Sequence, residues 1–231
     1  YSNSPEGTAT GTSAMRTILV LNPKGGSGKT TVATNIAVYY ALRGRKTVLV
    51  DMDPQGSAID WLAVRPESRA HITGIHTADG GGRVPRDAEI AVLDAPAGAK
   101  GRALSDLLRR VHTVVVPVVP SPIDLRAAVR FYDHLIGMTR VVNRAVRIAT
   151  VANRVREISP NRNALEEYLR GLRLPDGRKL PFTTVLRNTQ AYLRAAERGL
   201  GVWELAPSLV QHELELWKPL VRWLNSKQSV P

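Results

Sequence analysis

Residues 17–31 read Thr17-Ile18-Leu19-Val20-Leu21-Asn22-Pro23-Lys24-Gly25-Gly26-Ser27-Gly28-Lys29-Thr30-Thr31, and this stretch decides the fold of the 231-residue chain. Its apolar, β-branched first part predicts a short buried strand. Beyond the glycines, apolar residues recur at helical spacing, namely Val32, Ile36, Ala37 and Tyr40. A strand, a glycine-rich turn and a helix in this order are the context that a phosphate-binding loop requires.

The loop carries the groups that bind a nucleoside triphosphate. Glycines let the backbone curl so that its N–H groups face phosphate oxygens, and the helix N-terminus adds the positive end of its dipole. We expect Lys29 to reach the β- and γ-phosphates and the Thr30 hydroxyl to ligate Mg²⁺. A glycine-rich turn with a solvated lysine is the alternative, and the flanking strand and helix disfavour it. The expected nucleotide-binding residues here are Lys24, Gly25, Gly26, Ser27, Gly28, Lys29, Thr30 and Thr31.

One position departs from the ordinary pattern G-x-x-x-x-G-K-T. Its first glycine is replaced by Pro23, and a second lysine, Lys24, follows directly. The arrangement K-G-G-x-G-K-T resembles the deviant Walker A loop of the ParA/MinD family of ATPases. The resemblance implies a homodimer that sandwiches ATP, in which the extra lysine reaches the partner subunit's nucleotide. Lys24 and Lys29 are therefore both expected to act in catalysis.

A second apolar run, 47–50, leads into Asp51-Met52-Asp53-Pro54-Gln55-Gly56. Carboxylates at the carboxyl end of a strand, beside a phosphate loop, lie where nucleotide chemistry occurs in a doubly wound sheet. The segment resembles switch I of ParA-type proteins. The resemblance implies that Asp53 lies near the metal and positions the attacking water. A plain Asp-Pro-Gln-Gly turn is the alternative.

A third strand-like run, 89–94, also ends in a carboxylate, that of Asp94. This is the Walker B pattern, whose aspartate holds Mg²⁺ through its coordination shell. The segment 95–98 resembles switch II of the family, and 117–124 resembles its P-x-x-P-S-P-x-D segment. Together these motifs imply ATP and Mg²⁺ as cofactors, with Thr30, Asp53 and Asp94 around the metal.

Strand-like and helix-like segments alternate over residues 15–231 and leave no room for a second domain. The pattern predicts an α/β fold of the P-loop NTPase type, a single doubly wound, mostly parallel sheet with helices on both faces. Residues 1–14 are Ser/Thr/Gly-rich and precede Met15, so we expect them to be a disordered remnant of cloning. A short helix over 57–64 is expected to bury Trp61 in the core.

The second half of the chain is the more basic. Residues 15–124 hold 14 Lys/Arg against 10 Asp/Glu, whereas residues 125–231 hold 18 against 9. Such an excess favours a polyanion partner, nucleic acid or an anionic membrane, over ordinary solvated arginines. We expect a helix over 187–198 that brings Arg187, Arg194 and Arg198 near one face. In ParA-like proteins the corresponding region contributes arginines to sequence-independent DNA binding.

Two further segments bear on ligands. A strand over 146–152 is followed by Asn153, and in relatives an asparagine after this strand hydrogen-bonds the adenine. The last segment, 208–225, is amphipathic, and MinD-type proteins end in a membrane-seeking helix of this kind. Here Pro219 interrupts the segment and its polar face mixes glutamates with basic residues, whereas a membrane helix favours lysine and arginine. We therefore expect it to dock on the sheet.

The resemblance implies an ATP-timed cycle. A dimer formed with ATP binds DNA non-specifically, and a cargo adaptor protein stimulates hydrolysis and release, which positions a plasmid, a chromosome region or a protein body such as the carboxysome. The resemblance therefore predicts a cytoplasmic, nucleoid-associated protein. The sequence contains no run of eighteen apolar residues, so it does not predict a transmembrane segment. A membrane-surface regulator of the MinD type is the alternative. Relatives that carry iron–sulfur clusters need cysteine ligands, and the chain has no cysteine.

Overall fold

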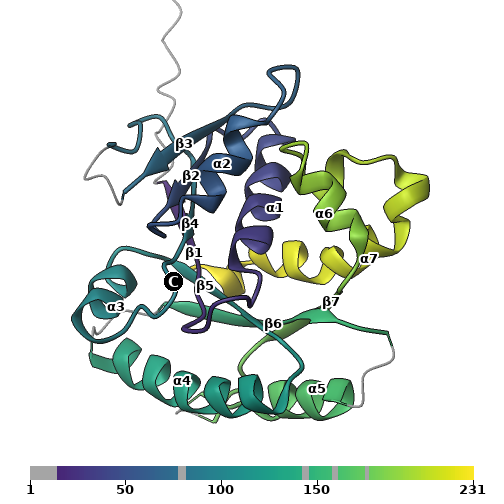
Figure 1. Cartoon of the computed structure of the whole chain (residues 1–231). Coiled ribbons are helices and arrows are strands. Elements are labelled where there is room, and N and C mark those ends of the chain that lie inside the picture. The colour runs from purple at the N-terminus through teal and green to yellow at the C-terminus, as the bar shows by residue number, and fades with distance from the viewer. Residues whose placement is uncertain (1–14, 78–81, 142–145, 158–160, 175–176) are drawn as a thin grey trace, which may run out of the picture.

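The computed structural model describes residues 15–77, 82–141, 146–157, 161–174 and 177–231 (Figure 1). The expectation about residues 1–14 falls outside these ranges. The strands are β1 Arg16–Val20, β2 Thr47–Asp51, β3 Ile72–His76, β4 Ile90–Asp94, β5 Thr113–Val118, β6 Arg147–Val155 and β7 Phe182–Arg187. The helices are α1 Lys29–Ala41, α2 Ser57–Ala63, α3 Gly101–Leu108, α4 Pro122–Val141, α5 Asn161–Gly171, α6 Gln190–Ala196 and α7 Pro207–Leu224, with the short 3₁₀ turns η1 Val202–Glu204 and η2 Lys227–Ser229.

The strands form one seven-stranded sheet in the order β3-β2-β4-β1-β5-β6-β7. Every pairing is parallel, so all carboxyl ends lie along the same edge. The chain places β2, β3 and β4 on one side of β1 and β5, β6 and β7 on the other. The order therefore reverses beside β1, which is where ligands bind in open α/β sheets. The predicted fold class is confirmed.

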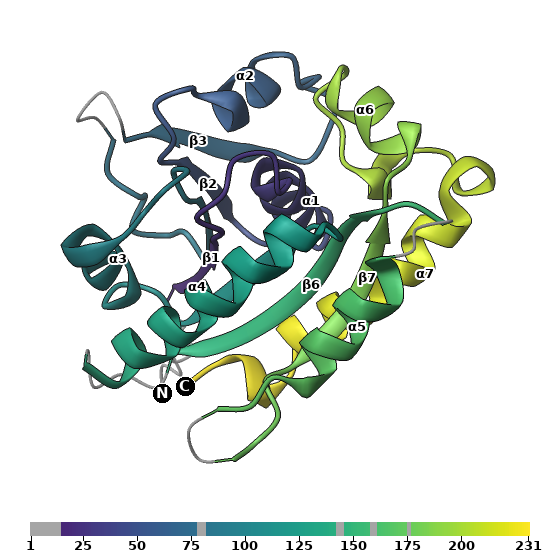
Figure 2. The ribbon, with the colours of Figure 1, turned by 60° about the horizontal axis from the view of Figure 1, so that its bottom comes forward.

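Two apolar layers cover the two faces of the sheet. Alternate residues of a strand point to opposite faces, so Ile18 and Val20 belong to one layer and Leu19 to the other. The first layer packs under α1, α2 and α7, and the second under α3, α4 and α5. Figure 2 shows α4 and α5 on the same side of the sheet, where α5 contacts β6. Trp61 lies in the first layer and is 6% exposed, as predicted.

The last helix, α7, docks on the sheet through its apolar face. Its buried residues include Val210, Trp217, Leu220 and Leu224, and Nε1 of Trp217 donates to the Tyr192 hydroxyl at 2.9 Å. Contrary to expectation, Pro219 lies inside a continuous helix. No helix within the described ranges is long and apolar enough to cross a membrane. The predicted docking is confirmed.

The expectation of one helix over 187–198 is wrong. Arg187 is the last residue of β7, where it pairs in register with Val155, and α6 begins only after Thr189 caps it by accepting the Ala191 N–H at 3.3 Å. The Arg187 guanidinium forms ion pairs with Glu157 and with the buried Glu213. The prediction from helical spacing is wrong because β7 continues through Arg187 and directs its side chain toward Glu213 of α7. Arg194 and Arg198 are exposed.

Candidate functional site

The carboxyl ends of β1, β2 and β4 bring the three predicted motifs together. In the sheet register, Asp94 of β4 lies level with Val20 of β1 on one side and with Asp51 of β2 on the other. The glycine-rich loop follows β1 and leads into α1 after Gly28, whose φ is +80°. The loop and both acidic segments therefore face one another because parallel pairing aligns the strand ends.

A cleft of about 300 Å³ opens between these segments. Its lining combines the loop and the first turn of α1 with parts of both switch-like segments and one residue near the end of β6: Gly25, Gly26, Gly28, Lys29, Thr30, Thr31, Asp53, Gln55, Ser57, Ala97 and Arg154. Lys29 is largely buried. Lys24 is exposed and is not among the residues that line the cleft.

The Thr30 and Asp94 side chains form a site that fits Mg²⁺. The Thr30 Oγ1 donates to Oδ2 of Asp94 at 2.6 Å. Among the described residues, Oδ1 of Asp94 is buried and has no hydrogen-bond partner. Mg²⁺ prefers oxygen ligands and keeps several waters, so this oxygen and the Thr30 hydroxyl suit a hydrated ion carried in with nucleotide phosphates.

The electrostatics of Asp94 support the same interpretation. Burial of the carboxyl group raises the pKa of Asp94 to about 7, and the Thr30 hydrogen bond only partly opposes this effect. The neighbouring carboxylates of Asp51 and Asp53 raise the pKa further, whereas Lys29 lowers it. A carboxyl group that is buried beside like charges binds a cation or a proton, because the bare anion is poorly solvated there.

The two aspartates of the switch I-like segment have different tasks. Asp51 is fully buried and accepts backbone N–H bonds from Asp53 at 3.0 Å and from Ala58 at 2.7 Å, so it holds the start of α2. Asp53 is half-buried, lines the cleft, and accepts the Ala97 backbone N–H at 3.2 Å. Asp53 thus links the two switch-like segments across the cleft.

Hydrogen bonds to backbone groups connect the loop to its neighbours. Nδ2 of the Asn22 side chain donates to the Pro117 carbonyl at 2.6 Å, and its Oδ1 accepts the Lys24 backbone N–H at 2.8 Å. The Gly98 N–H donates to the Pro23 carbonyl at 3.0 Å. Pro23 therefore occupies the place of the missing glycine with its carbonyl bonded to the switch II-like segment.

The end of β6 also contacts the loop. The buried Asn153 amide donates to the Ser27 carbonyl at 2.8 Å, and the Arg154 guanidinium donates to the Gly26 carbonyl at 2.8 Å. The adenine contact expected of Asn153 stays a prediction. Sequence reasoning missed Arg154, because the spacing of apolar residues in β6 says nothing about a bend that turns it toward the loop.

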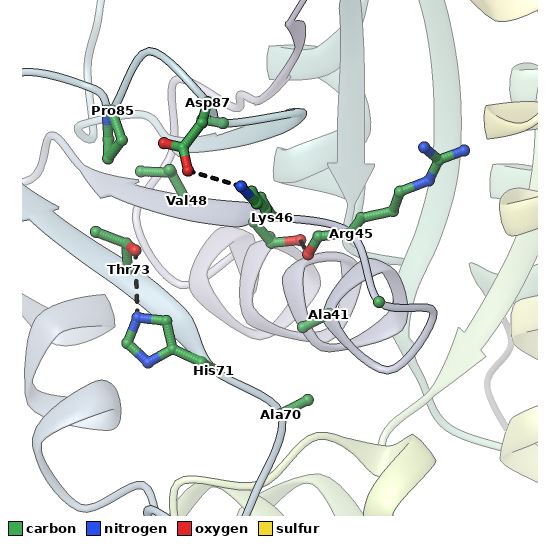
Figure 3. A pocket seen from close by; sticks show the side chains of 12 residues that line it. Ala41, Arg45, Lys46, Val48, Ala70, His71, Thr73, Pro85 and Asp87 are labelled. Carbon is green, nitrogen blue, oxygen red and sulfur yellow. Dashed lines mark hydrogen bonds and ion pairs between the residues drawn. The ribbon is translucent and has the colours of Figure 1, made fainter. Parts of the chain in front are cut away.

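A second cavity, of about 430 Å³, lies at the opposite edge of the sheet, by the amino ends of β2 and β3 (Figure 3). Its Lys46 and Asp87 side chains pair with each other at 2.9 Å, and His71 contacts Thr73 at 3.3 Å. These polar side chains therefore bond to one another in the wall of the cavity. The carboxyl edge, with its buried cation site, is the better candidate for chemistry.

Comparison with known proteins identifies the family of the chain. The model of the CobQ/CobB/MinD/ParA nucleotide binding domain matches residues 18–202. The chain is 29% identical over 195 residues to a "Maintenance of carboxysome distribution protein A" from Halothiobacillus neapolitanus, covering 82% of this chain and 87% of the relative. A protein of that name from Gloeobacter kilaueensis is 31% identical over 197 residues, covering 81% and 83%. The solved ATP complex of a Cyanothece McdA variant matches with a TM-score of 0.67 at 16% identity, covering 90% of this chain and 97% of that chain, which shows the shared fold alone.

The raised pKa of Asp94 gives a pH test of the metal site. Mg²⁺ must displace the proton when Asp94 is protonated, so metal affinity falls as the pH drops through about 7. We expect the Mg²⁺-dependent gain in ADP affinity, measured by calorimetry, to shrink about tenfold from pH 8 to pH 6.

The control is Asp94→Asn, which removes the titrating group. The nucleotide phosphates titrate alike in both proteins, so the variant reports their contribution alone. The same pH dependence in wild type and variant would contradict the assignment of Asp94 to the metal.

Proposed function

Because the chain belongs to the CobQ/CobB/MinD/ParA nucleotide-binding family, we propose that it is an ATPase that dimerises around ATP and Mg²⁺. The dimer binds DNA without sequence preference and positions a cargo on the nucleoid, in the cytoplasm. One observation carries the proposal: the loop holds one lysine inside the cleft and another outside it. Lys29 is buried beside Asp94 and lines the cleft, whereas Lys24 is exposed and is not among the lining residues.

The two lysines have separate roles in the proposed cycle. Lys29 neutralises the β- and γ-phosphates of its own nucleotide, and Lys24 reaches the nucleotide of a second copy that faces the cleft. Each subunit then completes the phosphate site of the other. Formation of the dimer depends on ATP for this reason, because the partner lysine needs the terminal phosphates as its counter-charge.

Hydrolysis is assigned to Asp53, which orients the attacking water next to the metal held by Thr30 and Asp94. Its contact with the Ala97 N–H supports a role that changes with the nucleotide, since both segments border the cleft. Positioning a water is the usual contribution of such residues in phosphoryl transfer. A cargo adaptor accelerates this step and so releases the dimer from DNA.

The cargo is proposed from the relatives. Two of them carry the name "Maintenance of carboxysome distribution protein A", which favours a protein body over a plasmid. The MinD-like alternative, a regulator on the membrane surface, would use the last helix as its anchor. The apolar face of α7 is buried against the sheet, so this segment gives that alternative no support.

Removal of Lys24 separates nucleotide binding from dimerisation. Lys24→Ala retains Lys29 and the whole cleft, so we expect nucleotide affinity within about threefold of wild type, because Lys24 acts on the partner's nucleotide. The variant stays monomeric with ATP and Mg²⁺ in light scattering, whereas the wild type doubles its mass. Lys179→Ala removes the same charge from an exposed residue that is not among those lining the cleft and serves as the control. A dimeric Lys24→Ala protein would refute the role of this lysine.

The DNA contact is tested on Arg194 and Arg198, the two of the three predicted DNA-binding arginines that are exposed. We expect Arg194→Glu with Arg198→Glu to abolish retention on DNA with ATP while dimerisation persists. Arg187 is unsuited to this test, since its loss would leave Glu213 buried without its cation, at a cost of about 3 kcal/mol. Wild-type affinity should fall by roughly 10³-fold from 50 to 200 mM salt if about six phosphates are contacted.

The control for charge is Arg102→Glu with Arg110→Glu. Both arginines are exposed on or next to α3, which packs on the other face of the sheet from α6. Equal losses in the two double variants would mean that net charge alone governs binding. Retention of DNA by Arg194→Glu with Arg198→Glu would contradict the proposed surface.

A further inference from the structure

Two side chains at the end of β6 hydrogen-bond to two consecutive peptide groups of the phosphate loop, an arrangement that we call the grip. Arg154 bonds the Gly26 carbonyl and Asn153 bonds the Ser27 carbonyl, each at 2.8 Å. In a planar trans peptide the carbonyl and the N–H of the same unit point in opposite directions. Because both carbonyls are held on the β6 side, the N–H groups of Ser27 and Gly28 are directed away from β6 and are available to an anion bound by the loop.

The backbone of β6 is irregular at the two residues that form the grip. The β6–β7 pairing shifts register between Ala152 and Val155, and such bulges re-aim side chains next to functional sites. Arg154 has φ +54°, the one positive value among non-glycine residues of the described chain. This left-handed conformation is unfavourable for a long side chain, and strain of this kind persists where the surrounding structure fixes it.

The loop is shaped to receive the two side chains. A Cβ atom at Gly28 would lie 2.4 Å from Nδ2 of Asn153 and 3.7 Å from Cδ of Arg154. Gly28 is therefore needed for the approach of β6 as well as for its own φ of +80°. The Arg154 side chain is exposed along part of its length and reaches the rim of the cleft.

We propose that Arg154 and Asn153 are positioning residues that preorganise the phosphate loop, Arg154 by holding the Gly26 carbonyl outward. The inference rests on the proposed nucleotide binding and adds a residue to it. The oriented N–H groups serve the phosphates that ADP and ATP have in common, so loss of the grip weakens both nucleotides alike. A direct contact of Arg154 with the terminal phosphate would weaken ATP alone.

Arg154→Asn tests the grip with little disturbance of the backbone. Asparagine tolerates positive φ better than most residues but is too short to reach the Gly26 carbonyl. We expect ADP and ATP affinities, measured by calorimetry with Mg²⁺, to fall by a similar factor, on the order of tenfold for one lost charge-assisted hydrogen bond. The KM for ATP should rise by this factor with kcat nearly unchanged, since the loop binds the phosphates equally in the ground state and the transition state.

Two further variants separate the grip from charge and from strain. Arg156→Asn removes the same charge from an exposed residue two positions on, and we expect wild-type affinities. Arg154→Gly relieves the positive φ, so its thermal midpoint is not lowered by strain, and it should lose affinity as Arg154→Asn does. This second variant keeps the test valid if Arg154→Asn folds poorly.

The outcomes are distinguishable. Wild-type protein that binds neither ADP nor ATP would refute the proposed function itself. Wild-type binding of both, with unchanged affinities in the two Arg154 variants, would overturn only the grip. A loss confined to ATP would overturn it as well, because it would make Arg154 a direct ligand of the terminal phosphate.

Discussion

A buried carboxyl group that must bind either a cation or a proton is the constraint on which the site depends. Asp94 ends a central strand, its Oδ1 is buried without a partner among the described residues, and burial raises its pKa to about 7. Its Oδ2 is held by Thr30 from the first turn of α1. In the proposed function a Mg²⁺ ion that arrives with the nucleotide would satisfy this oxygen.

At the carboxyl edge of the sheet, the loop and the two switch-like segments are linked in series by single hydrogen bonds. The Gly98 N–H donates to the Pro23 carbonyl of the loop, and the Ala97 N–H donates to the Asp53 carboxylate of the switch I-like segment. Both contacts end on adjacent residues of one short turn that borders the cleft. In the proposed cycle, a change at the terminal phosphate would reach the loop and the two acidic segments through these contacts.

The sequence predicted the parts of the site that depend on local pattern. The glycine-rich loop and the carboxylates at strand ends follow from spacing, because parallel pairing brings strand ends to one edge whatever the exact register. Arg187 was misplaced because its environment is set by β6 and α7, which are distant in sequence. Arg154 was missed because a bulge and a positive φ leave no mark on apolar periodicity. Asp51 looked like a site residue, and only the backbone N–H groups of α2 show that it is structural.

In the proposed cycle ATP and Mg²⁺ together assemble the dimer. Sedimentation velocity of the wild-type chain at one concentration, with ATP or ADP and with Mg²⁺ or a chelator, measures this assembly. We expect a doubled mass with ATP and Mg²⁺ and a monomer in the other three conditions. A mass that is the same in all four, whether monomer or dimer, would contradict it.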